Sequence, residues 1–267
     1  MTNLVRAELF KLRTTPGPWI CVAVTVLLTG LGVTTAFIVA HHGAAHFSAP
    51  TTTAGLRSLV GAGYEAGVVM APVLGVICIT TEYRHRVLTA TLLLHPKRSE
   101  VVTAKVIASV VWGLLVSVAY FAMVAAMGIP LLLAEGGSVS AMLHQVAPVV
   151  PGILAAYALL SMYGMGIGTL VKNQIGGVIL ALGITLVLEP IIVAIFGSLA
   201  HIDVNFLPSR ATQAVAGGLV PRATANANAG AASALLLSWW AGALALVGWG
   251  LGASVLGYFV SFRRDVS

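Results

Sequence analysis

Hydrophobic positions in this chain fall into six long runs, and most charged positions fall between the runs. A helix needs roughly 20 apolar residues to cross a bilayer core of about 30 Å, and each run is long enough to do so. We therefore predict an all-α membrane protein in which residues 1–267 form a single transmembrane domain. The predicted transmembrane helices are 18–40, 59–81, 106–133, 148–171, 175–199 and 233–261.

Proline and glycine positions within these runs indicate where helices bend or approach one another. Glu189-Pro190 lies deep in the fifth run, and proline removes a backbone donor and clashes one turn back, so we expect the fifth helix to break or bend there. Pairs of glycines four residues apart allow close contact between helices, either inside the chain or at a dimer seam. These pairs are Gly63/Gly67, Gly164/Gly168 and Gly248/Gly252.

The composition excludes a soluble globular protein. Of the 267 residues, 58% are hydrophobic and 8% are charged, whereas soluble domains carry about 25% charged residues. No soluble domain of ordinary size fits beside six spans. The first run is too long for the apolar core of a signal peptide, so we expect no cleavage. Cys21 and Cys78 lie inside apolar runs and are interpreted as small core residues.

The placement of basic residues predicts the orientation of the helices. The net charge of +6 comes from short clusters between spans, without a basic block interleaved with aromatic residues, so no nucleic-acid partner is predicted. Cytoplasmic loops retain Lys and Arg, and eleven basic residues fall on one side against three on the other, which predicts that both termini are cytoplasmic. The eleven are Arg6, Lys11, Arg13, Arg84, Arg86, Lys97, Arg98, Lys105, Lys172, Arg263 and Arg264, and the three are Arg57, Arg210 and Arg222.

Three segments outside the spans have distinct characters. Residues 1–17 precede the first span, and residues 200–232 form a long extracellular loop with a short helix predicted around Ser209–Gly217. The most charged segment is the cytoplasmic loop 82–105, whose apolar middle predicts a short helix at the membrane surface. This loop either contacts a partner or anchors the chain at lipid headgroups. Its candidate contact residues are Glu82, Tyr83, Arg84, His85, Arg86, Lys97 and Arg98.

Four short motifs, in their order and spacing, resemble type-2 ABC transporter permeases of actinobacteria, the membrane subunits of exporters whose ATPase is a separate chain. The sequence has Arg86-Val87 where that family usually has Gly-Thr. The motifs are Leu4-Val5-Arg6-Ala7-Glu8-Leu9-Phe10-Lys11-Leu12-Arg13-Thr14-Thr15, then Glu82-Tyr83-Arg84-His85 with Pro96-Lys97-Arg98 and Lys105, then Phe206-Leu207-Pro208, and finally Arg263-Arg264-Asp265-Val266.

The resemblance implies an ABC exporter permease in the bacterial cytoplasmic membrane, working as a homodimer or as a heterodimer with a related permease. It implies that the loop 82–105 supplies a coupling helix for the ATP-binding subunit and that residues 1–17 form an interfacial helix. ATP and Mg²⁺ would belong to that partner. The chain itself lacks a P-loop, because none of its four lysines follows a glycine, so we predict no cofactor and no enzymatic activity of its own.

Two acidic residues and a histidine cluster are candidates for a transport pathway or a metal site. Glu189 is costly inside a membrane unless it is paired, protonated or exposed to water, so it either lines a pathway or accepts a hydrogen bond inside the outer bundle. Glu65 is expected at the headgroup level. The cluster His41, His42 and His46 has no nearby Cys, Asp or Glu to complete a metal site, so no metal is predicted.

Two other functions remain open from the residues alone. Glu189 and the broken fifth helix are compatible with an ion-coupled secondary transporter, although neither inverted repeats nor several midplane polar residues are evident. A non-transporting membrane regulatory protein is the other alternative. The sequence does not identify the substrate, and the direction of transport follows only from the resemblance.

Overall fold

The computed structural model describes residues 2–41, 53–85, 98–171, 173–199, 204–217 and 237–257, and all regular secondary structure within these ranges is helical. Two segments of the fifth span, η2 and η3, are π-helical, and η1 is a single turn of 3₁₀-helix. The elements are α1 (Thr2–Thr14), α2 (Pro16–His41), α3 (Thr53–Val68), α4 (Met70–His85), α6 (Arg98–Ala134), α7 (Val139–Val146), η1 (Ala147–Val149), α8 (Val150–Leu170), α9 (Gln174–Gly183), η2 (Ile184–Leu188), α10 (Glu189–Ile192), η3 (Val193–Leu199), α11 (Pro208–Val215) and α12 (Trp239–Gly257).

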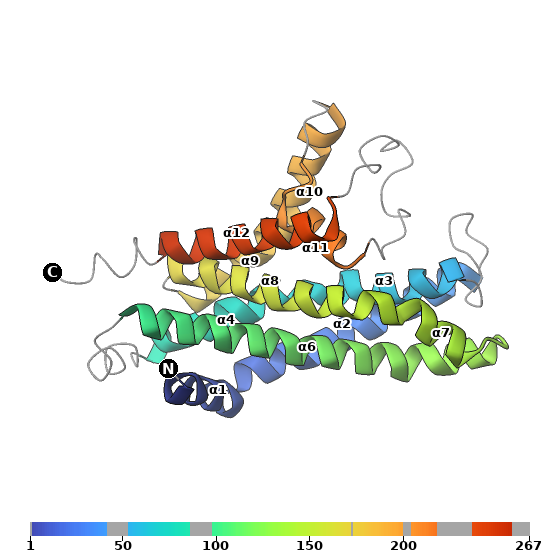
Figure 1. Ribbon diagram of the computed structural model, residues 1–267, viewed down its shortest axis with the longest axis horizontal. Coiled ribbons are helices and arrows are strands. Elements are labelled where there is room, and N and C mark those ends of the chain that lie inside the picture. The colour runs from blue at the N-terminus through green and yellow to red at the C-terminus, as the bar shows by residue number, and fades with distance from the viewer. Residues whose placement is uncertain are drawn as a thin grey trace.

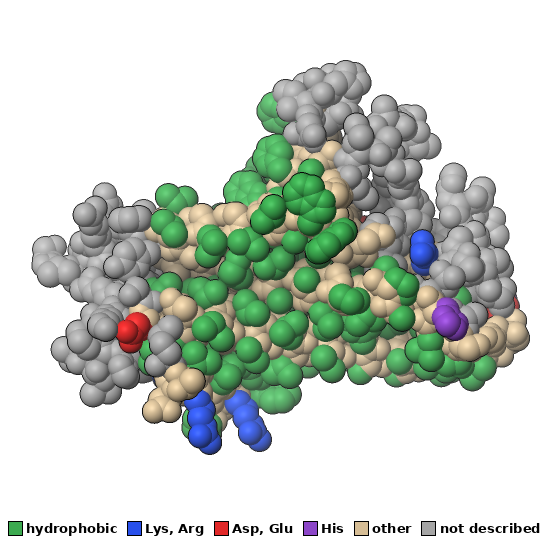
Figure 2. Space-filling model, in the orientation of Figure 1, with side chains coloured by type: hydrophobic (Ala, Val, Ile, Leu, Met, Phe, Trp, Pro, Cys, Tyr) green, Lys and Arg blue, Asp and Glu red, His purple; other side chains and the backbone are tan. Residues whose placement is uncertain are grey.

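Six helical stretches among the described residues are long and apolar enough to cross a membrane, which confirms the six predicted spans. Figure 2 shows hydrophobic side chains over the middle of one face of the bundle, whereas the visible charged side chains lie toward its two ends. This distribution suits a lipid environment. The stretches are Pro16–His41, Gly55–Thr81, Glu100–Ala134, Met142–Leu170, Gln174–Phe196 and Trp239–Gly257.

Helix α8 forms the centre of the bundle. It packs against α4, α6 and α12, which run beside it along the long axis of the molecule (Figure 1). Nearly every residue of α8 from Ala156 to Thr169 is buried. Because lipid is as apolar as these side chains, burial here reflects close helix packing and not exclusion from water.

Glycines bring the backbones of α4 and α8 into direct contact. A Cβ atom at Gly75 would overlap the carbonyl oxygen of Ser161, and one at Gly164 would overlap that of Pro72. The predicted close approach at Gly164/Gly168 is therefore found inside the chain, as is that at Gly63/Gly67, where α3 meets α2. In contrast, a Cβ at Gly248 or Gly252 of α12 would meet no atom of the described residues within 4 Å.

The fifth span departs from regular α-helix around Glu189-Pro190, as the sequence predicts. The π-helical segments η2 and η3 flank the single turn of α10. In Figure 1 this part of the chain points away from the bundle. Only 11% of the most apolar part of this span is buried, against 67% for the second span. The fifth span is therefore the part of the transmembrane region that the rest of the described chain covers least.

Candidate functional site

Helix α1, the end of α4 and the start of α6 meet at one end of the bundle, which we call the basic end (Figure 1). Helix α1 is amphipathic: Leu4, Glu8 and Leu12 are buried at a spacing of four residues, while Arg6 and Arg13 are exposed on other faces. Leu4 packs with residues of α6. Helix α1 therefore lies against the third span, and the interfacial position that the resemblance implies for residues 1–17 stays a prediction.

Seven residues were predicted to contact an ATPase, and the structure describes the backbone of five of them, all at this basic end. Glu82, Tyr83, Arg84 and His85 form the last turn of α4, and Arg98 begins α6. The side chains of these five residues lie outside the described part of the chain, as do Arg86 and Lys97 altogether. Their role as coupling residues stays a prediction.

A buried ion pair joins α1 to α6 close to these residues. Glu8 is 3% exposed and Lys105 is 2% exposed, and the Lys105 Nζ donates to Glu8 Oε2 at 2.7 Å. The other carboxylate oxygen, Oε1, accepts from Lys11 Nζ at 2.8 Å. Burial raises the pKa of Glu8, but Lys105 and Lys11 lower it by more, so the pKa lies below its usual value. The carboxylate therefore stays ionised and holds the two elements together.

This pair was not predicted, although the sequence contains a signal for it. Glu8 lies four residues from both Leu4 and Leu12, so it falls on the apolar face of its own helix. Lys105 lies four residues after Val101, which is also buried. Charges of opposite sign on the buried faces of two elements at the same end of a bundle point to an ion pair.

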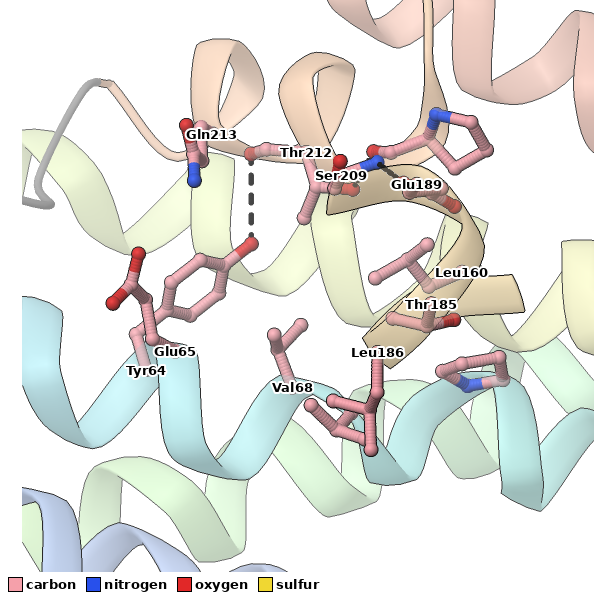
Figure 3. A pocket seen from close by; sticks show the side chains of 13 residues that line it. Tyr64, Glu65, Val68, Leu160, Thr185, Leu186, Glu189, Ser209, Thr212 and Gln213 are labelled. Carbon is pink, nitrogen blue, oxygen red and sulfur yellow. Dashed lines mark hydrogen bonds between the residues drawn. The ribbon is translucent and has the colours of Figure 1, made fainter. Parts of the chain in front are cut away.

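A second site is a cavity of about 200 Å³ inside the transmembrane region, between α3, α8, the fifth span and α11. Figure 3 shows Glu65 and Gln213 at one end and Glu189 and Ser209 at the other, with apolar side chains between them. The sequence predicted a headgroup-level position for Glu65. The structure places this residue in the cavity wall, together with Glu189, and its level relative to the headgroups stays a prediction.

Glu189 caps the N-terminus of α11. The backbone N–H of Ser209, one of the first amides of that helix, donates to Glu189 Oε2 at 2.7 Å. The N-cap residue Leu207 provides no side-chain hydrogen bond of its own, so Glu189 satisfies a donor that the helix leaves free. Glu189 is 2% exposed, and its Oε1 has no hydrogen-bond partner among the described residues. Within the described part of the chain, Glu189 therefore accepts a hydrogen bond through one oxygen only.

Three tyrosines fix the helices beside this cavity. Tyr64, Tyr120 and Tyr157 are buried, and their rings lie 5.8 to 6.2 Å apart. The Tyr120 hydroxyl donates to the Val60 carbonyl at 2.9 Å, and the Tyr64 hydroxyl contacts the Thr212 carbonyl at 3.5 Å. The Tyr157 hydroxyl has no partner in the described part of the chain. Tyr64 therefore connects α3 to α11, the helix that closes the cavity.

The histidine cluster is only partly described. His41 Nδ1 lies 3.3 Å from Glu135 Oε1, and His42 and His46 lie outside the described residues. Among the residues that the structure describes, no group of three or more His, Cys, Asp or Glu side chains could hold a metal ion.

Comparison with known proteins identifies a family for this chain. A protein family described as "ABC-2 family transporter protein" matches residues 4–188, which include α1, the first four spans and much of the fifth. A search of curated proteins finds no match to the chain.

Proposed function

The chain belongs to the ABC-2 family of transporter proteins, and on this premise we propose that it is the permease subunit of an ABC exporter. It is a multi-pass membrane protein and a component of a membrane transporter. In the proposed complex it moves a substrate across the bacterial cytoplasmic membrane, and a separate subunit hydrolyses ATP. The match over 185 of 267 residues is the observation that carries this proposal.

The need for a partner ATPase is supported by the lysines of the sequence. A P-loop requires a lysine after a glycine, but Lys11, Lys97, Lys105 and Lys172 follow Phe, Pro, Ala and Val. ATP and Mg²⁺ therefore belong to the partner in our proposal. The proposed contact is the segment 82–105, which the sequence predicted as a loop. In the structure its first residues end α4 at His85 and its last residues begin α6 at Arg98, both at the basic end.

We further propose that the functional unit contains two permeases, as a homodimer or a heterodimer, with the basic end in the cytoplasm. The sparse burial of the fifth span supports a second permease, because apolar helices at such an interface are covered by a partner. The excess of Lys and Arg at the basic end supports the orientation. A fluorescent protein fused to the C-terminus would be fluorescent in the cytoplasm, and a periplasmic reporter there would be inactive.

The test is reconstitution with a candidate ATP-binding subunit from the same organism. We expect the two proteins to co-purify and the complex to hydrolyse ATP with substrate movement. Arg84→Ala and Glu82→Ala should weaken co-purification, whereas Arg57→Ala, an exposed residue at the opposite end of the bundle, should not. Transport by the purified chain alone down an ion gradient would refute the proposal.

A further inference from the structure

The cavity beside Glu65 has the polarity of a site for a positively charged, mainly apolar molecule. Carboxylates from two different elements line its ends, and Val68, Leu160 and Leu186 line the middle (Figure 3). Among the residues that the structure describes, no basic side chain lines the cavity, and its charged lining residues are Glu65 and Glu189. The fixed charge in the wall is therefore negative.

Both carboxyl groups retain capacity to accept an interaction. The Glu65 side chain is half-buried and, within the described part of the chain, makes no hydrogen bond or ion pair. Glu189 is 2% exposed and uses only one oxygen, toward Ser209. A carboxylate in the membrane interior is costly without a partner. A cation bound in this cavity would provide an opposite charge for these carboxylates.

The size of the cavity limits the ligand. A dry apolar cavity of about 150 Å³ is large enough for benzene, and this cavity measures about 200 Å³. It therefore accepts one aromatic ring or a similar apolar group together with a small charged head. The buried ring of Tyr64 and the aliphatic side chains of α3 and η2 provide the apolar contact.

We propose that this cavity binds lipophilic organic cations, with Glu65 as the counter-ion and the apolar middle around the body of the ligand. Glu189 holds α11 over the cavity and adds negative charge at its far end. That such a cation is the transported substrate rests on the proposed function. That the cavity binds it can be tested on the isolated chain.

The test uses two probes of nearly equal shape, phenyltrimethylammonium and its uncharged isostere tert-butylbenzene. The full-length protein is reconstituted in phosphatidylcholine nanodiscs, and equilibrium binding of each radiolabelled probe is measured without ATP. We expect phenyltrimethylammonium to bind at least about tenfold more tightly than tert-butylbenzene. Glu65→Gln should remove that difference, and tenfold in affinity corresponds to about 1.4 kcal/mol.

Two controls keep the test decisive. Glu135→Gln removes a carboxylate that lies outside the cavity, paired with His41, and should leave cation binding unchanged. Should Glu65→Gln not fold, labelling of Glu65 in the unaltered protein by dicyclohexylcarbodiimide should be slowed by phenyltrimethylammonium and not by tert-butylbenzene. Equal affinity for both probes, or full cation binding by a folded Glu65→Gln variant, would overturn the proposal.

The outcome is separable from that of the proposed function. If the isolated chain binds the cation but the reconstituted complex shows no ATP-driven transport, the cation site is supported and the exporter function is refuted. If the complex transports another compound with ATP but the chain does not bind phenyltrimethylammonium, the exporter function is supported and the cation site is refuted.

Discussion

Replacing Lys105 by methionine tests whether the buried ion pair attaches α1 to the third span. At 2.7 Å between Lys105 Nζ and Glu8 Oε2, the gross attraction is about 6 kcal/mol at an effective dielectric constant of about 20. Desolvation of the two ions, which are 2% and 3% exposed, offsets most of this attraction. Losing Lys105, however, leaves the buried Glu8 carboxylate with only its contact to Lys11 in the described part of the chain.

We expect Lys105→Met to lower the free energy of unfolding by about 3 kcal/mol, the lower end of the range for breaking a buried pair. The lower end applies because Lys11 still contacts Glu8 at 2.8 Å. The double variant Glu8→Leu/Lys105→Met should recover most of the loss, since two apolar side chains then replace two ions. Arg13→Met, at an exposed position of α1, should change stability by less than about 0.5 kcal/mol.

The assay is denaturation by sodium dodecyl sulfate in mixed micelles, followed by tryptophan fluorescence and by the distance between spin labels on α1 and α6. A free energy of unfolding for Lys105→Met within about 0.5 kcal/mol of that of the unaltered protein would refute a stabilising role of the ion pair. So would a double variant no more stable than the single one. Either result would mean that apolar contacts such as Leu4 with Val101 hold α1 in place without the ion pair.

The same pair predicts a dependence on pH. The pKa of Glu8 in the folded protein lies below its usual value of 4.5, so its stabilising effect is complete above about that pH. The effect is lost as the pH falls through the lower pKa of the folded state, because the protonated carboxyl no longer attracts Lys105. Lys105→Met should therefore show a smaller loss of stability between neutral pH and strongly acidic pH than the unaltered protein.

Three matched pairs of variants test the packing of the bundle in the same denaturation assay. Gly164→Ala should destabilise by about 3 kcal/mol, since its Cβ overlaps a backbone carbonyl, whereas Gly248→Ala should be neutral or slightly stabilising. Glu189→Leu should cost about 2 kcal/mol by leaving the amide of Ser209 without an acceptor, whereas Glu189→Gln, which retains an acceptor oxygen, should cost less than half of that. Tyr120→Phe should cost about 1 kcal/mol through its lost hydrogen bond, and Tyr157→Phe, whose hydroxyl has no partner among the described residues, should cost nothing. Equal effects within any pair would contradict the contacts on which that pair is based.

The spans could be predicted from the sequence because their length and apolar character follow directly from the thickness of a bilayer. A helix can continue past its apolar run, and hydropathy alone does not show where it begins. The third run begins at 106, but α6 begins at Arg98, since Val101 and Ala104 are buried against Leu4 across otherwise polar residues. There the helical spacing of a few apolar residues decides the structure, and average hydropathy does not detect it.

The cavity could not be predicted from the sequence. Glu65 and Glu189 are far apart in the chain and share a wall only because α11 folds back over α3 and the fifth span. A short helix at this place was predicted from the loop composition, but its contact with Glu189 depends on tertiary packing. Glu189 could be singled out from the sequence, because a carboxylate within an apolar run requires a partner or water; its role stays a prediction.

The glycine contacts give the bundle an uneven mechanical stiffness. Where α8 meets α4 at Gly75 and Gly164, and α12 at Gly166 and Gly257, little or no side chain separates the backbones, and closely packed interiors are nearly incompressible. A displacement applied at the end of α4 would therefore tilt α4, α8 and α12 together as one rigid unit. The fifth span, with two π-helical segments and little cover, is the compliant element. Any strain that these three helices deliver would be absorbed there, next to Glu189, which caps α11 at one end of the cavity.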